Sequence, residues 1–139
     1  MRQGYELVDH TADVGVRAWA PSREGVFEEA AKAAFSLICD PLTIDQTETH
    51  ELRLDAEDRE LLLVAWLNEL IYVFEAKRML FVDFELVELD DTHLVARVTG
   101  EQLDPSRHAI CGGVKAATLH ELSLTEGPSG WEAFVILDV

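Results

Sequence analysis

Two carboxylate-bearing segments lie at opposite ends of the chain. The first is His10-Thr11-Ala12-Asp13-Val14-Gly15, and the second is the C-terminal run Val135-Ile136-Leu137-Asp138-Val139. The second segment reads as a strand that continues to the last residue, so Asp138 lies next to the free carboxylate of Val139. If the two segments pair in one sheet, three negative groups come together, and such a cluster is unfavourable without a cation. Because hard divalent cations prefer oxygen ligands, this pattern predicts a metal site formed by Asp13, Asp138 and Val139.

Each of these charged residues also has a purely structural explanation. Asp13 follows Thr11 and can satisfy the amides of a turn at the entry to a strand. Asp138 can lie at the solvated rim of a sheet, next to a buried face. Lys115, in a chain poor in cations, is either an ordinary surface lysine or a lysine beside the acidic cluster, where it would tune the cluster's charge or contact a phosphate. The residues alone leave these alternatives open.

Signatures of common enzymes are absent from the sequence. It contains no GxSxG, P-loop, HExxH or zinc-type Cys/His spacing. The five histidines are scattered, and an isolated histidine is more often a surface or hydrogen-bonding residue than a ligand. The apolar run over residues 61–71 predicts a core helix, in which Asn68 and Glu69 are polar exceptions expected at its edge.

Composition and charge limit the classes of function. With 139 residues, of which 48% are hydrophobic, the chain predicts a single domain over residues 1–139. Its 27 acidic and 11 basic residues give a net charge of −16, which disfavours stable direct binding to nucleic acid. Basic protein partners or metal ions suit such a surface better, although solubility or a high-salt source would also explain it. With no apolar run of membrane-spanning length, no signal-peptide pattern and two distant cysteines, we expect a cytoplasmic protein with reduced thiols and no membrane association.

Hydrophobic periodicity predicts the secondary structure. One helix is capped by Ser22 and runs through Cys39, and a second begins at Asp58. Phe27, Leu37, Leu67 and Phe74 on these helices are expected in the core. Strands are expected over residues 5–10, 14–20, 48–54, 79–89, 93–99, 114–124 and 131–139, with residues 100–113 as a loop. This order predicts an α+β fold, a mostly antiparallel sheet with two helices packed on one face.

Taken together, these segments resemble the archease family. The resemblance spans essentially the whole chain, and its motifs are specific as a set in this order. They are His10-Thr11-Ala12-Asp13-Val14-Gly15; Trp66-Leu67-Asn68-Glu69-Leu70 followed by Phe81-Val82-Asp83-Phe84; Gly100-Glu101, Asp104-Pro105 and Arg107-His108; Lys115-Ala116-Ala117-Thr118 with His120; and Ile136-Leu137-Asp138-Val139.

The resemblance implies a fold related to strand-helix-strand-strand modules and a function as a helper protein. Archeases act with an RtcB-type RNA ligase, which joins an RNA 3′-phosphate or 2′,3′-cyclic phosphate to a 5′-hydroxyl using GTP and divalent metal in tRNA splicing or RNA repair. They promote guanylylation of the ligase and multiple turnover. Carried over to this chain, the metal ligands are Asp13, Asp138 and Val139, binding calcium, magnesium or manganese.

The resemblance further implies that Lys115 is the functional lysine, and it places His10 and His120 with Lys115 in activation of the partner. One departure is Leu119, where the family usually has an aromatic residue. Two other functions remain open. One is a modulator or chaperone of a tRNA methyltransferase, and the other is a small metal-dependent phosphohydrolase using Asp13 and Asp138.

Overall fold

The computed structural model describes residues 3–9 and 13–139, so His10 lies outside the described residues. The helices are α1 (Arg23–Ser36) and α2 (Arg59–Lys77), with a short 3-10 helix η1 (Pro41–Thr43). The strands are β1 (Gly4–Asp9), β2 (Val14–Ala20), β3 (Glu48–Asp55), β4 (Met79–Leu89), β5 (His93–Gln102), β6 (Ala116–Ala117), β7 (Ser123–Gly127) and β8 (Gly130–Asp138).

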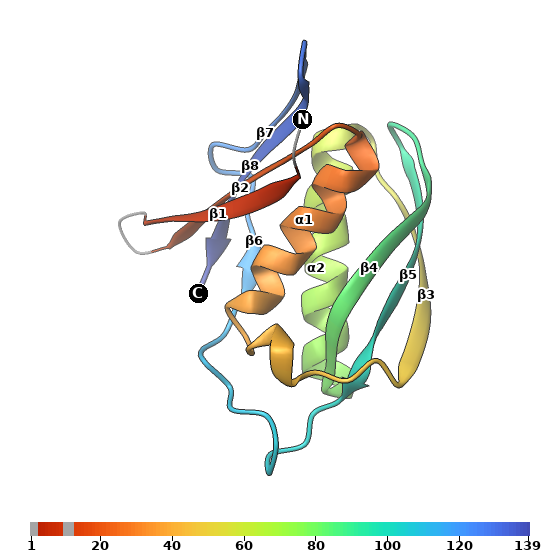
Figure 1. Ribbon diagram of the computed structural model, residues 1–139. Coiled ribbons are helices and arrows are strands. Elements are labelled where there is room, and N and C mark those ends of the chain that lie inside the picture. Colours follow the sequence, from red (N-terminus) through yellow and green to blue (C-terminus); the bar gives the residue numbers. More distant parts are fainter. Residues whose placement is uncertain (1–2, 10–12) are drawn as a thin grey trace.

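The strands divide into two antiparallel sheets with both helices between them (Figure 1). The larger sheet has the order β1-β2-β8-β6, and β7 also pairs with β8. The smaller sheet has the order β3-β5-β4 and forms, with α2, a strand-helix-strand-strand unit. Each helix contacts strands of both sheets. The predicted α+β class, with antiparallel strands and two helices on one face of a sheet, is confirmed, and the division into two sheets is an addition to it.

Both predicted helix starts are confirmed by their caps. The hydroxyl of Ser22 accepts a hydrogen bond from the amide of Gly25 at 3.1 Å, and a carboxylate oxygen of Asp58 accepts one from the amide of Leu61 at 2.9 Å. Such caps satisfy amides that have no partner within the helix. Helix α2 ends at Arg78, which takes a left-handed conformation with φ 55°.

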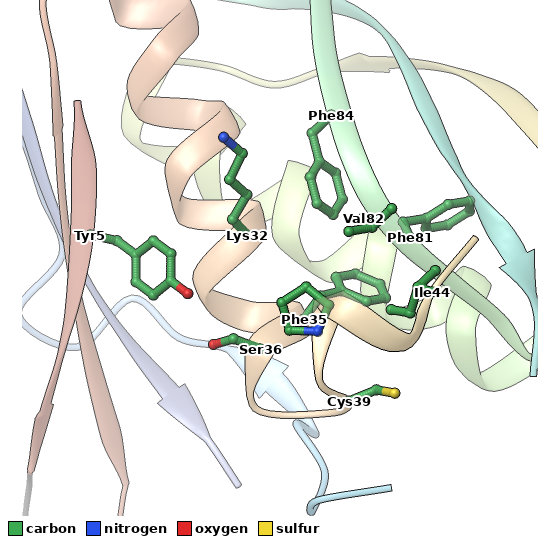
Figure 2. A pocket seen from close by; sticks show the side chains of 10 residues that line it. Tyr5, Lys32, Phe35, Ser36, Cys39, Ile44, Phe81, Val82 and Phe84 are labelled. Carbon is green, nitrogen blue, oxygen red and sulfur yellow. The ribbon is translucent and has the colours of Figure 1, made fainter. Parts of the chain in front are cut away.

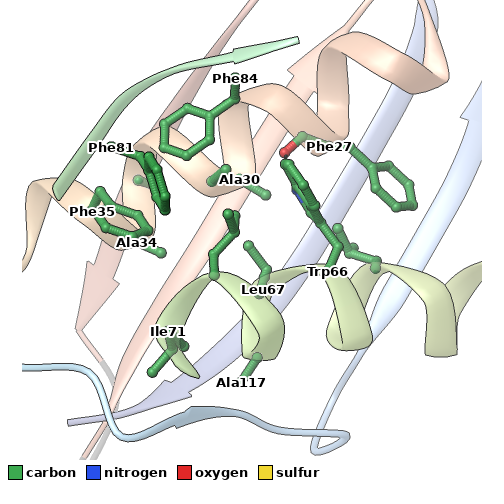
Figure 3. Packing of buried hydrophobic residues seen from close by; sticks show 14 of the residues in the cluster. Phe27, Ala30, Ala34, Phe35, Trp66, Leu67, Ile71, Phe81, Phe84 and Ala117 are labelled. Atoms are coloured by element: carbon green, nitrogen blue, oxygen red, sulfur yellow. Dashed lines mark hydrogen bonds between the residues drawn. The ribbon is translucent and has the colours of Figure 1, made fainter. Parts of the chain in front are cut away.

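The core is centred on the contact between the two helices and the inner faces of the sheets (Figure 3). Trp66 of α2 is fully buried, and its indole N–H donates to the carbonyl oxygen of Phe27 in α1 at 2.9 Å. Phe27 and Leu67 are fully buried and Phe74 is 8% exposed, as predicted, whereas Leu37 is only partly buried. None of the helices in the described part of the chain is long and apolar enough to cross a membrane.

The predicted single strand over residues 114–124 is wrong. The segment does run along β8, but only β6 and β7 pair with it. The amide of Thr118 donates to Ile136 and Ser123 pairs with Phe134, so residues 119–122 have only Val135 opposite them and must turn away. Within that turn Glu121 adopts a left-handed conformation with φ 55°.

The expected loop also begins later than predicted, because β5 continues through Gln102. Gly100 lies inside this strand, where it pairs with both neighbouring strands. A Cβ atom at Gly100 would lie 1.8 Å from the carbonyl oxygen of Leu80, so only glycine allows this close approach.

Candidate functional site

The two acid-bearing ends of the chain lie on neighbouring strands of the larger sheet. Strands β2 and β8 are antiparallel, and their register ends with Val14 opposite Leu137. Asp13 directly precedes Val14 and Asp138 directly follows Leu137, so continuation of this register by one residue would bring Asp13 opposite Asp138. Side chains at directly opposite positions of an antiparallel pair lie on the same face, with Cβ atoms about 4.5–5.5 Å apart. The condition stated from the sequence, that the two segments pair in one sheet, is met for Val14 and Gly15 of the first segment.

Strand alternation places Asp138 on the outer face of the larger sheet, away from the helices. Val16 and Leu137 are buried in the core, at 1% and 0% exposure, so residues one step away along each strand face the other side. Asp138 is exposed, and Val139 is 42% exposed. The facing positions are thus at an open end of the sheet, which a partner can approach.

Strand β6 brings Lys115 to the other side of Asp138. The backbone amide of Lys115 donates to the carbonyl oxygen of Asp138 at 2.7 Å, and Ala116 is the register partner of Asp138. Lys115 itself is exposed. The fold therefore gathers Asp13, Asp138, Val139 and Lys115 at one end of the sheet. We call this end, defined by those four residues, the acidic end.

The two histidines predicted to act in partner activation are placed differently. His10 lies outside the described residues. His120 is exposed and lies in the turn over residues 119–122, beyond the end of β6. Since Thr118 already bonds to Ile136, His120 lies further along β8 than the level of Asp138. Leu119, at 60% exposure, is in the same turn.

The acidic end has the donor chemistry that a hard divalent cation requires. The side chains of the two aspartates supply only oxygen, the donor that calcium, magnesium and manganese prefer. Like charges at facing positions repel each other, so a cation between them would relieve an unfavourable contact. Among the described residues, no three side chains of His, Cys, Asp or Glu gather in a group that could hold a metal. The metal set includes only two such side chains, and it stays a prediction.

A second polar cluster fixes the start of the loop that leads to Lys115. Glu101, at 7% exposure, accepts hydrogen bonds from the amide of Asp45 at 2.6 Å and from Nε2 of His108 at 3.0 Å, and it forms an ion pair with Arg107. Nδ1 of His108 accepts the amide hydrogen of Asp104 at 2.9 Å, which leaves the ring proton on Nε2. In the sequence Glu101, Asp104, Arg107 and His108 appeared only as motif members, with no role assigned.

Hydrogen bonding within this cluster favours the ionised form of Glu101. The pKa of Glu101 is lowered, chiefly by the amide of Asp45 and then by the side chains of Arg107 and His108, against the opposing effect of burial. Further along the loop, the amide of Cys111 donates to the carbonyl oxygen of Ile38 at 2.8 Å. Cys39 and Cys111 are both free thiols. The loop is therefore held at several points before it reaches Lys115.

A residue that sequence reasoning noted without assigning a role is Asn68 of α2. Its side-chain oxygen accepts the amide hydrogen of Ala117 at 2.8 Å, and its side-chain nitrogen donates to the carbonyl oxygen of Ala117 at 3.2 Å. In the sequence, the only indication of this role was a side-chain amide within an otherwise mostly apolar helical run. Its partner lies 49 residues away, which no local pattern reveals.

A separate pocket of about 120 Å³ lies between β1, α1 and β4 (Figure 2). Two of its polar side chains bond within the protein, since Lys32 donates to Glu29 at 2.9 Å and Ser36 donates to the carbonyl oxygen of Ala33 at 2.6 Å. The described residues that line it include no His, Asp or Glu. They are Tyr5, Lys32, Phe35, Ser36, Cys39, Pro41, Ile44, Phe81, Val82 and Phe84.

Comparison with known protein families assigns the chain. The model of the Archease protein family matches residues 5–139. This chain belongs to the archease family. It is 36% identical over 139 residues to a protein archease of Methanosarcina barkeri, covering 97% of this chain and 95% of that protein. It is 35% identical over 140 residues to a protein archease of Pyrococcus abyssi, covering 97% and 98% of the two chains.

Solved structures of archease relatives support the fold. The solution structure of Methanobacterium thermoautotrophicum protein 1598 matches with a TM-score of 0.81 and 32% identity, covering 98% of this chain and 99% of that chain. The crystal structure of an archease from Thermotoga maritima, described as a possible chaperone, matches with a TM-score of 0.63 and 20% identity, covering 100% and 98%. At that identity the second likeness concerns the fold alone.

Proposed function

We propose that this archease is a non-enzymatic activator of an RtcB-type RNA ligase in tRNA splicing or RNA repair, and that it promotes guanylylation of the ligase. Membership of the family supports this function. The observation that supports the proposal is the antiparallel pairing of β2 with β8, whose last pair, Val14 and Leu137, is adjacent in sequence to Asp13 and to the exposed Asp138. A site that acts on a partner must be open in this way.

In this proposal the residues of the acidic end have separate tasks. Asp13, Asp138 and the terminal carboxylate of Val139 hold and orient a divalent cation through oxygen atoms. When bound, that cation supplies positive charge toward phosphate oxygens. Lys115, which is exposed beside Asp138, adds a second positive group at the same end. Positive groups positioned before the reaction stabilise charge that develops on phosphates as the ligase histidine attacks GTP.

The charge of the chain supports a protein partner rather than RNA. A net charge of −16 opposes direct contact with phosphates, but it favours docking onto a ligase whose RNA-binding groove should be basic. We therefore propose no stable nucleic-acid binding by the chain itself. Two free thiols are consistent with action in the cytoplasm.

The direct test is a guanylylation assay of a purified RtcB-type ligase, with labelled GTP and substoichiometric amounts of this archease. We expect the wild-type chain to increase labelling and turnover, and Asp13→Ala, Asp138→Ala and Lys115→Ala to abolish the increase while melting near the wild-type temperature. Glu132→Ala, which removes an exposed carboxylate elsewhere on β8, is the matched control and should retain stimulation. Full stimulation by a folded Asp13→Ala/Asp138→Ala double variant would refute the mechanism.

A chaperone function is the second candidate, because the resemblance to archeases also allows a modulator or chaperone of a tRNA methyltransferase. The two functions differ in the enzyme that the chain binds. A pull-down from cell extract, followed by identification of the bound enzyme, separates them. Recovery of a tRNA methyltransferase without any ligase, together with no effect on guanylylation, would favour the chaperone function.

A further inference from the structure

Asn68 satisfies the open edge of strand β6. β6 contains only Ala116 and Ala117, and it is the last strand in the order β1-β2-β8-β6. On one side, the amides of Lys115 and Thr118 donate to carbonyl oxygens of β8. On the other side, the side-chain amide of Asn68 binds both the N–H and the C=O of Ala117. The side chain thus occupies the place where a further strand would pair.

The position of Asn68 on α2 makes this a contact between the core helix and the functional edge of the sheet. Ala117 lies beside α2 (Figure 3). Ala117 is 6% exposed, so its N–H and C=O have little access to water. Unpaired backbone groups in such a place are costly, which explains an amide within an apolar helix.

The contact also lies two residues from Lys115. Ala116, between Lys115 and Ala117, is the register partner of Asp138. Before Lys115 in the chain, Gly112 and Gly113 restrict the backbone little, and Val114 is the residue whose side chain is buried in the core. The bond from the Lys115 amide to the Asp138 carbonyl therefore depends on β6 staying in place.

We propose that Asn68 is a positioning residue for the acidic end. By holding Ala117 through two hydrogen bonds, it fixes β6 against β8 and thereby sets the place of Lys115 and the last residues of β8. Without it, β6 loosens, and Asp138 and Val139, which lie beyond the last pair of β2 with β8 at Leu137, lose their neighbouring strand. The part of this inference that concerns ligase stimulation and cation affinity rests on the proposed function, whereas the part that concerns the backbone does not.

Two variants test the role of the amide. Asn68→Ala removes both hydrogen bonds, and Asn68→Asp keeps the shape and the acceptor but replaces the donor with a repulsive oxygen. Trp66→Phe is the matched control, because it removes a buried hydrogen bond from the same helix that leads to α1 rather than to β6. All three are compared well below their melting temperatures, by amide hydrogen exchange, calcium titration and the guanylylation assay.

We expect both Asn68 variants to speed amide exchange at Ala117 and at Lys115 at least about tenfold, while exchange at Val16 in the middle of the sheet is unchanged. Calcium affinity and ligase stimulation should each fall at least about fivefold in these variants and stay at the wild-type level in Trp66→Phe. Unchanged exchange at Lys115 would overturn the inference. Wild-type calcium affinity and stimulation in a folded Asn68→Ala variant would overturn it as well, since Asn68 would then have only a structural role.

The experiments distinguish failure of the proposed function from failure of the inference about Asn68. If the wild-type chain does not stimulate the ligase, that function is refuted. The exchange measurement at Lys115 still decides whether Asn68 positions β6.

Discussion

Trp66→Phe tests whether the bond between the two helices stabilises the fold as the structure indicates. The indole is fully buried, and its N–H bonds to the carbonyl oxygen of Phe27 at 2.9 Å. Its ring also packs edge-on against Phe84, with centroids 6.3 Å apart. A phenylalanine at position 66 can keep the aromatic contact but has no donor and leaves a cavity.

The expected cost follows from these two losses. A phenylalanine is smaller by about 40 Å³, which at about 24 cal/mol per Å³ of cavity corresponds to roughly 1 kcal/mol. Loss of the hydrogen bond adds about 0.5–1.5 kcal/mol. We therefore expect the free energy of unfolding to fall by about 2 kcal/mol, with a decrease in melting temperature of roughly 6–10 °C for a domain of this size.

Urea unfolding followed by circular dichroism measures this change. Tyr72→Phe is the control, because Tyr72 is on the same helix but 63% exposed, and its substitution should change the free energy of unfolding by less than about 0.5 kcal/mol. A Trp66→Phe variant as stable as Tyr72→Phe would refute the idea that the indole ties α2 to α1.

Three further predictions concern stability and its pH dependence. Burial raises the pKa of Glu28, although the hydrogen bond from the amide of Leu86 acts in the opposite direction, so the charged form of Glu28 is disfavoured in the fold. Glu28→Gln should therefore raise the free energy of unfolding at pH 7. This gain should disappear as the pH falls below the ordinary glutamate pKa, where Glu28 is protonated in both states. The pKa of Glu101 is lowered, so its effect on stability is the opposite. Ionised Glu101 stabilises the fold at neutral pH, and this stabilisation is lost as the pH falls from the ordinary glutamate pKa through the lowered one. Glu101→Gln should therefore flatten the acid limb of a curve of unfolding free energy against pH. Leu67→Ala should cost about 2–5 kcal/mol in urea unfolding and Leu37→Ala clearly less, because only the first side chain is fully buried; equal losses would contradict the assigned core.

Local patterns predicted the elements of this fold well. Ser22 and Asp58 stand where capping residues are expected, and both accept the amide hydrogens of their helices. The hairpin at Asp90 is similar, since one carboxylate oxygen accepts the amides of Thr92 and His93 at 2.9 and 2.8 Å. These interactions span a few residues, so the sequence contains the whole cause.

Strand pairing could be predicted only in part. Alternation identifies the two faces of a strand but not its neighbours. Hence the division into two sheets was not evident, and residues 114–124 read as one strand. The strand is interrupted because four residues, 119–122, lie opposite the single residue Val135 of β8. This difference can be recognised only once the strand pairing is known.

The candidate site shows the same limit. Asp13 and Asp138 stood out because each is the one carboxylate in an apolar, strand-like segment, and the pairing of β2 with β8 brings Val14 opposite Leu137, the residues next to them. The link between Asn68 and Ala117 had no such signal, because it joins a helix to an edge strand far along the chain.

The central claim, that the acidic end binds a divalent cation, is tested most directly by calorimetric titration with calcium. An Asp13→Asn/Asp138→Asn variant is compared with Glu6→Gln/Glu132→Gln, which removes the same charge from two carboxylates that pair with Arg17 on the same sheet. We predict saturable binding by the wild-type and the glutamate variant, and its loss in the aspartate variant. Equal calcium affinity in the aspartate variant and the wild-type protein would contradict the account.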